Sequence, residues 1–180
     1  MAFPGLSDQD LRQAEREWWE EVVRRVYAQR APERVLRDYF SEVFEAFRDT
    51  EAWELLPETR AELEKLRAMG FRLGVISNFD SRLYDVLESL GIRSLLECVI
   101  ISSRAGAAKP DAAIFQQALA TMGVAASEAL HVGDTLEVDA YGAQRAGLHA
   151  VLLDPAGRYA GRQDVLIVKN LAELCSLLEV

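Results

Sequence analysis

Two aspartates, Asp134 and Asp139, follow closely on an apolar run that ends at Val132-Gly133. This pattern predicts that Asp134 lies at the tip of a strand and that Asp139 opens the next helix. Ligands bind at the carboxyl ends of strands in an open parallel sheet. Two carboxylates at this spacing can converge on one hard cation such as Mg²⁺. The sequence therefore predicts a metal site at Asp134 and Asp139. The alternative is that Asp134 only caps the following helix.

Two further segments carry groups that could bind an anion. Ser77 and Asn78 end an apolar run and precede a helix, where a hydroxyl and backbone N–H groups can hold a phosphate oxygen. Ser-Asn at a strand end would also suit a simple turn or helix cap. Lys109 precedes Pro110, which favours an extended backbone and could aim the ammonium across the sheet edge. There it would neutralise a phosphoryl group or a carboxylate, unless it is a solvated loop lysine.

From residue 58 onward, helical and strand patterns alternate along the chain. The strands are short and continuously apolar, as in a parallel sheet that is covered on both faces. The sequence thus predicts an α/β core, a three-layer doubly wound parallel sheet, over residues 57–180. Residues 1–56 form a separate helical part with amphipathic helices at 7–29 and 33–48. In the core we expect helices at 58–69, 81–90, 111–122, 139–146 and 171–178, and strands at 71–76, 98–101, 130–132, 149–153 and 165–168.

Composition excludes several classes of protein. The net charge of -9, without any basic run, argues against nucleic-acid binding. No apolar stretch approaches the roughly 20 residues that span a bilayer, so we expect no membrane association. Cys98 and Cys175 lie in apolar settings and are expected to be buried free thiols, which favours a cytoplasmic location. His131 and His149 fit no zinc or Ser-His-Asp spacing and are expected to be structural.

The segments Ile76-Ser77-Asn78, Lys109-Pro110-Asp111 and Gly133-Asp134 with Asp139 resemble, in order and spacing, three motifs of one family. They are similar to the second, third and fourth motifs of the haloacid dehalogenase (HAD) superfamily. The resemblance covers residues 57–180 and implies a HAD-like, Rossmannoid core. The helices around Trp18-Trp19 resemble part of the helical cap of such proteins.

The resemblance also implies roles for these residues. Ser77 would bind the transferring phosphoryl group, helped by the backbone at Asn78, and Lys109 would stabilise the phosphoryl charge. Asp134 would ligate Mg²⁺, and Asp139 would support either that ligand or Lys109. The implied activity is a magnesium-dependent phosphohydrolase that acts on a small phosphorylated metabolite. The paired acids resemble the phosphatase pattern more than that of dehalogenases, which need no metal.

One family motif has no counterpart here. The family begins with an apolar strand that ends in Asp-x-Asp, whose first aspartate is the nucleophile and whose second is the general acid. The only Asp-x-Asp in this chain is Asp8-Gln9-Asp10, which leads into a helix and is expected to be its N-terminus. An aspartyl-phosphate cannot form without the attacking carboxylate. We therefore expect weak Mg²⁺ binding and an inactive chain.

In the family, the first strand lies between the strands that end here at Ser77 and Asp134. Buried backbone groups cannot stay unpaired cheaply, so the lack of this strand has three possible explanations. The two flanking strands pair directly, a segment of another copy fills the slot, or the chain is a truncated form. We expect truncation. Exposed apolar surface on the cap helices, or the unfilled slot, would favour a homodimer. Two functional alternatives stay open: a nucleophile-less binding or regulatory protein, and a haloacid dehalogenase-like hydrolase.

Overall fold

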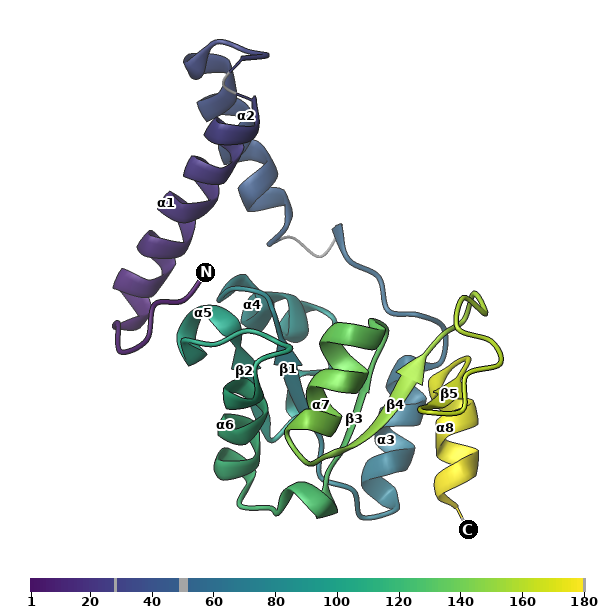
Figure 1. Ribbon diagram of the computed structural model, residues 1–180. Helices are drawn as coiled ribbons and strands as arrows, with labels where there is room; N and C mark the ends of the chain where they lie inside the picture. Colours follow the sequence, from purple (N-terminus) through teal and green to yellow (C-terminus); the bar gives the residue numbers. More distant parts are fainter. Residues whose placement is uncertain (28, 49–51, 180) are drawn as a thin grey trace.

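The computed structural model describes residues 1–27, 29–48 and 52–179. Two N-terminal helices, α1 (Asp8–Tyr27) and α2 (Glu33–Ala46), form a hairpin that stands away from an α/β core (Figure 1). They correspond to the predicted helices, although position 28 lies outside the described residues. The Asp10 N–H donates to Ser7 Oγ at 3.2 Å, and Asp8 and Asp10 occupy the first turn of α1. The Asp-x-Asp sequence is thus a helix N-terminus, as predicted.

The core alternates helices and strands as the sequence predicts. Every predicted strand is present, and the predicted boundaries mostly agree within a few residues. Short 3₁₀ turns, η2 (Arg93–Leu95) and η3 (Ala126–Glu128), join some elements. The remaining elements are α3 (Thr59–Ala68), β1 (Gly74–Ser77), α4 (Arg82–Ser89), β2 (Cys98–Ile101), α5 (Ser102–Ala105), α6 (Ala112–Met122), β3 (Leu130–Gly133), the π-helical turn η4 (Leu136–Ala140), α7 (Tyr141–Arg145), β4 (His149–Leu153), β5 (Leu166–Val168) and α8 (Leu171–Leu178).

The parallel sheet is divided into two parts. Strand β1 pairs with β2, and β3 pairs with β4, which pairs with β5; every pairing is parallel. Within the described ranges, no backbone pairing joins β1 to β3. The structure therefore rules out direct pairing of the two flanking strands, one of the three arrangements considered for a sheet without its first strand.

Helices cover both faces of the divided sheet (Figure 1). Side chains alternate along the strands, so that Ile76 and Ile100 pack with Phe115 of α6. Their neighbours Val75 and Val99 pack into the opposite cluster, which includes Leu87 of α4. Further along, residues of β4 and β5 pack against α8 on that second face. This arrangement is the three-layer α/β fold that was predicted.

Both cysteines are buried and free, as predicted. Burial raises the pKa of the Cys175 thiol to about 11, so the reactive thiolate is disfavoured there. Across the described residues, no helix has the length and apolar character needed to cross a bilayer.

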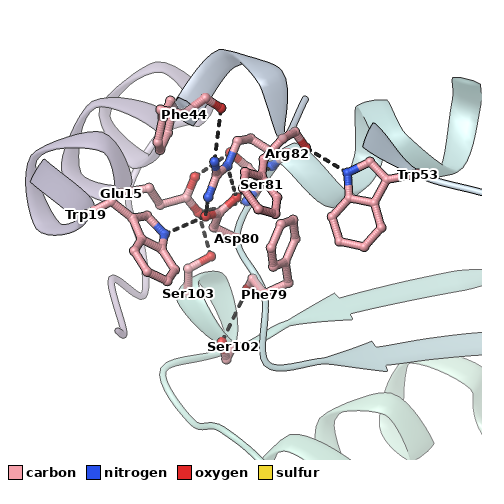
Figure 2. A network of polar contacts seen from close by, with 11 residues as sticks. Glu15, Trp19, Phe44, Trp53, Phe79, Asp80, Ser81, Arg82, Ser102 and Ser103 are labelled. Carbon is pink, nitrogen blue, oxygen red and sulfur yellow. Dashed lines mark hydrogen bonds and ion pairs between the residues drawn. The ribbon is translucent and has the colours of Figure 1, made fainter. Parts of the chain in front are cut away.

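A buried polar network anchors α1 to the core (Figure 2). The Glu15 carboxylate, only 1% exposed, accepts hydrogen bonds from the Ser81 N–H at 3.0 Å and from the Ser81 hydroxyl. The Ser103 hydroxyl donates to the same carboxylate at 2.5 Å. A buried carboxylate is tolerated only with such partners. Glu15 therefore ties α1 both to the loop after β1 and to α5.

A second branch of the network involves Asp80 and reaches both helices of the N-terminal hairpin. The Trp19 indole N–H donates to Asp80 at 2.8 Å, and Arg82 forms a two-point ion pair with the same buried carboxylate. Arg82 also donates to the Phe44 carbonyl of α2 at 3.1 Å and stacks on the Phe44 ring. The short segment after β1 thus holds the whole hairpin in place.

The predicted apolar face of α1 is only partly correct. The spacing of three and four residues places Trp18 and Val26 on one apolar face with Leu11 and predicts that they pack against a neighbouring helix, but they are 37% and 59% exposed. The face that meets the core carries Leu11 and Trp19, which belong to the predicted face, together with Glu15, which does not. The reason is that the hairpin stands away from the core, so that α2 packs along only one side of α1, and the core binds α1 through polar groups that periodicity does not detect.

We predict that Glu15→Ala destabilises the protein, because it leaves two buried serine hydroxyls and a backbone N–H without their acceptor. The free energy of unfolding should fall by about 2–3 kcal/mol, and hydrogen exchange across residues 8–27 should accelerate. Urea denaturation and hydrogen-exchange mass spectrometry measure both effects. The matched control is Glu17→Ala on the exposed face of the same helix, which should change stability by less than about 0.5 kcal/mol. Equal losses in the two variants would show that the network does not anchor α1.

Candidate active site

The carboxyl ends of β1 and β3 meet the loop before α6 at one edge of the sheet. Asn78, just after β1, forms two hydrogen bonds with the backbone of Lys109: its Nδ2 donates to the Lys109 carbonyl at 2.8 Å, and the Lys109 N–H donates to its Oδ1 at 2.7 Å. This two-point contact fixes the main chain of Lys109. The Asn78 side chain therefore positions the lysine, which leaves the backbone at Asn78 for the predicted phosphate contact.

The Lys109 ammonium forms an ion pair with Asp139. The distance from Nζ to Asp139 Oδ1 is 2.7 Å, and the two side chains are only 13% and 5% exposed. His131 Nε2 lies 3.2 Å from the same oxygen, and the Thr135 N–H donates to the other at 3.0 Å. Burial disfavours the Asp139 carboxylate, but the hydrogen bonds from His131 and Lys109 outweigh it and hold its pKa well below the usual range.

A π-helical turn and a glycine place the Asp139 carboxylate. The predicted helix at 139–146 begins instead with the wide turn η4, and α7 starts only at Tyr141. The Thr135 N–H bonds the Asp139 side chain, so the carboxylate folds back over the end of β3. A Cβ on Gly133 would lie 2.3 Å from Asp139 Cγ. Position 133 therefore has no room for a side chain while Asp139 holds this position.

A second glycine lets α7 approach the lysine loop from behind. A Cβ on Gly142 would lie 3.1 Å from Pro110 Cα and 3.2 Å from the Phe115 ring. Both distances are tighter than ordinary van der Waals contact. The loop that carries Lys109 is thus backed directly by the main chain of α7.

Ser77 and Asp134 complete the set of predicted residues. Ser77 is the last residue of β1 and is half-buried; within the described chain its hydroxyl has no hydrogen-bond partner. Asp134 follows the end of β3 and is exposed, with a contact from the Thr135 hydroxyl at 3.3 Å. Both side chains are available to a ligand at the edge where Lys109 lies.

The described residues do not make a complete magnesium site. In this part of the chain, no group of three or more His, Cys, Asp or Glu side chains could hold a metal ion. Asp139, predicted with Asp134 as a metal pair, has both oxygens occupied by Lys109, His131 and Thr135. Of the two roles that the resemblance left open for Asp139, the structure places it in contact with Lys109. Of this pair, Asp134 is the exposed carboxylate, with only the Thr135 hydroxyl in contact.

Sequence reasoning assigned His131 a structural role and did not connect it with the site. Its ring stacks edge-on against Phe115, with centroids 5.1 Å apart, and its Nε2 contacts Asp139. Alternation along β3 could have indicated this position, because residues 131 and 133 share a face. His149, the other histidine, contacts the Ser127 carbonyl at 3.1 Å.

Comparison with known proteins agrees with the motifs and the fold. A family model described as haloacid dehalogenase-like hydrolase matches residues 6–147. Haloacid dehalogenase-like hydrolase domain-containing protein 3 of Bos taurus is 33% identical over 148 residues, which are 78% of this chain and 59% of that protein. Glyceraldehyde 3-phosphate phosphatase of Methanothermobacter thermautotrophicus is 32% identical, over 68% of this chain and 58% of that protein.

Solved structures show the same fold. A HAD phosphatase from Thermococcus onnurineus superposes with a TM-score of 0.70 at 27% identity, covering 81% of this chain and 69% of that one. The present chain spans less than two thirds of the length of the curated relatives described above. The matched family model covers most of the chain, including the three motifs and the edge of the sheet where they meet. The chain therefore belongs to the haloacid dehalogenase-like hydrolases.

Proposed function

We propose that this site binds the phosphoryl group of a small phosphorylated metabolite, as part of a HAD-type phosphohydrolase. The observation that carries the proposal is Lys109, whose main chain is held by Asn78 and whose nearly buried ammonium is held by Asp139. It lies at the edge of the sheet where Ser77 ends β1 and Asp134 follows β3. The sugar-phosphate phosphatase among the relatives supports this substrate class.

The geometry suits phosphoryl binding because the lysine is fixed before any ligand arrives. Asp139 takes one of the three ammonium donors, which leaves two that can point toward a ligand. A nearly buried cation stabilises developing negative charge more strongly than a solvated one. The Ser77 hydroxyl and the backbone N–H groups that follow β1 supply neutral donors for the remaining phosphate oxygens.

Phosphate binding and ester hydrolysis place different demands on the two acids of this site. Of the two acids at the site, Asp139 is engaged with Lys109, and Asp134 is the free one that we propose as a weak Mg²⁺ ligand. Neither is thereby placed as a nucleophile, so we propose that these 180 residues bind phosphate but do not hydrolyse esters. Turnover would require an attacking carboxylate contributed by additional chain.

We expect Lys109→Ala to weaken phosphate binding by about ten- to a hundredfold, because charge-assisted hydrogen bonds contribute about 1.5–3 kcal/mol. Titration of the purified chain with inorganic phosphate, followed by ³¹P NMR, measures the affinity. Lys65→Ala removes another of the three lysines, one paired with the exposed Glu179, and should leave binding unchanged. Equal affinity in wild type and Lys109→Ala would remove the basis for the proposed site.

We expect no hydrolysis above background when the chain alone is incubated with p-nitrophenyl phosphate and Mg²⁺, because losing a covalent nucleophile costs many orders of magnitude in rate. Release of p-nitrophenol at 405 nm is the readout. Turnover that disappears in Asp134→Ala would contradict the division between binding and hydrolysis. Halide release from a 2-haloacid would instead indicate a dehalogenase.

The Lys109–Asp139 pair should make stability depend on pH in a defined direction. The pKa of Asp139 is lower in the folded state than in the unfolded chain, where it is about 3.9. Its contribution is therefore present above pH ~4 and lost as the pH falls through the folded pKa. Asp139→Asn should be less stable than wild type at pH 7, and the gap in unfolding free energy should shrink toward pH 3. Urea denaturation across this range measures the gap.

The control for this experiment is Asp134→Asn, which changes an exposed carboxylate on the neighbouring turn. Its stability should stay within about 0.5 kcal/mol of wild type at each pH. A gap for Asp139→Asn that is constant with pH would mean that ionisation of this residue does not stabilise the fold.

A further inference from the structure

The Lys109 ammonium stands at the end of a flexible four-carbon stem, so its position depends on what holds it. The contacts from Asn78 fix the main chain of Lys109. The ammonium itself meets Asp139, with Nζ at 2.7 Å from Oδ1. The placement of the ammonium therefore follows the orientation of the Asp139 carboxylate.

Asp139 lies on the irregular turn η4 and needs contacts of its own to keep one orientation. Its Oδ2 accepts the Thr135 N–H at 3.0 Å. A carboxylate that is held through one oxygen can pivot about that oxygen, whereas contacts at both oxygens fix it. The contact at Oδ1 that does not involve the lysine comes from His131, whose Nε2 lies 3.2 Å away.

His131 is suited to be the fixed partner, because both its main chain and its ring are held. Its main chain belongs to β3 and is paired in register with Ala150 of β4. Its ring packs edge-on against Phe115, which is fully buried, and its own side chain is only 10% exposed. An imidazole also has fewer rotatable bonds than a lysine side chain. Nε2 of His131 is therefore placed more firmly than the Lys109 ammonium.

Gly133 keeps the space between the His131 ring and the Asp139 carboxylate open. Residues 131 and 133 lie on the same face of β3. A Cβ on Gly133 would lie 2.3 Å from Asp139 Cγ, so the carboxylate occupies the space that a side chain at 133 would take. From there it reaches the imidazole along the strand.

The direction of the hydrogen bond between His131 and Asp139 follows from their chemistry. Asp139 is ionised, because its pKa is held well below the usual range, and an ionised carboxylate only accepts hydrogen bonds. The proton between the two side chains must therefore belong to Nε2 of His131, whether the ring carries one proton or two.

We propose that His131 is a positioning residue, which donates its Nε2–H to Asp139 and thereby fixes the carboxylate that holds the Lys109 ammonium. It acts on the ligand only through Asp139 and Lys109. Its effect on phosphate binding rests on the proposed function, whereas the state of the ammonium can be measured without a ligand. A purely structural histidine, packed against Phe115, would instead be replaced without loss by an apolar side chain.

Two substitutions separate the hydrogen bond from the packing. His131→Leu keeps an apolar side chain against Phe115 but removes the donor, whereas His131→Gln keeps an N–H donor at a similar reach. In the wild type we expect a resolved ¹H–¹⁵N NMR signal from the Lys109 ammonium, because a nearly buried, ion-paired ammonium exchanges slowly with water. The chain has only three lysines, so Lys109→Ala identifies this signal. The signal should be lost in His131→Leu and kept in His131→Gln.

Titration with inorganic phosphate, followed by ³¹P NMR, is the second readout. His131→Leu should bind phosphate about three- to tenfold more weakly than wild type, which is the range for loss of one neutral hydrogen bond. His131→Gln should stay within about twofold of wild type. The control is His149→Leu, which changes the other histidine, an exposed one in contact with the Ser127 carbonyl. It should leave both the ammonium signal and the affinity unchanged.

Failure of His131 as a positioning residue and failure of the phosphate site give different results. Equal phosphate affinity in wild type and Lys109→Ala would remove the phosphate site, but the ammonium signal in the His131 variants would still decide the role of His131. No resolved Lys109 signal in the wild type, its survival in His131→Leu, or equal loss in both variants would overturn that role. If His131→Leu does not fold, ¹⁵N spectra of the wild-type imidazole decide. A protonated Nε2 at neutral pH is expected, and an unprotonated one would overturn the proposal.

Discussion

The Lys109–Asp139 ion pair connects two parts of a sheet that share no backbone hydrogen bond in the described residues. On one side, Asn78 ties Lys109 to the end of β1; on the other, Thr135 and His131 tie Asp139 to β3. The carboxyl edge of the divided sheet is therefore joined by side chains alone. The same contacts that would orient a lysine toward a phosphoryl group also link the two parts at this edge, and an apolar cluster in which Ile76 and Ile100 pack with Ala150 links them elsewhere.

The N-terminal hairpin contacts this edge through a short segment that follows β1. Ser77 and Asn78 belong to the site, and Asp80, Ser81 and Arg82 anchor α1 and α2 only a few residues later. Because these groups are buried and mutually bonded, displacement of the hairpin would strain the end of β1. The position of the hairpin and the geometry of the segment after β1 are thus mechanically coupled.

The helices and strands of the core could be predicted from the sequence, because each is indicated by a pattern of a few consecutive residues. Strands such as Cys98–Ile101 and His149–Leu153 are short apolar runs, and their ends are marked by turn residues. The convergence of Ser77, Lys109 and Asp134 follows from parallel topology. Two partners were implied for Asp139, the metal ligand and Lys109. The choice between them could not be predicted, because it depends on a π-helical turn and on a glycine three residues before the turn begins. Glu15 was missed because a buried carboxylate whose partners lie far along the chain leaves no periodic pattern.

Gly142 of α7 lies against the loop that carries Lys109 and limits where that loop can lie. The main chain of α7 touches Pro110 where any larger residue would need space. A methyl group there would displace the loop that carries Lys109, without altering any residue to which we assign a role in ligand binding. The position of the Lys109 ammonium therefore depends on an amino acid that has no functional group of its own.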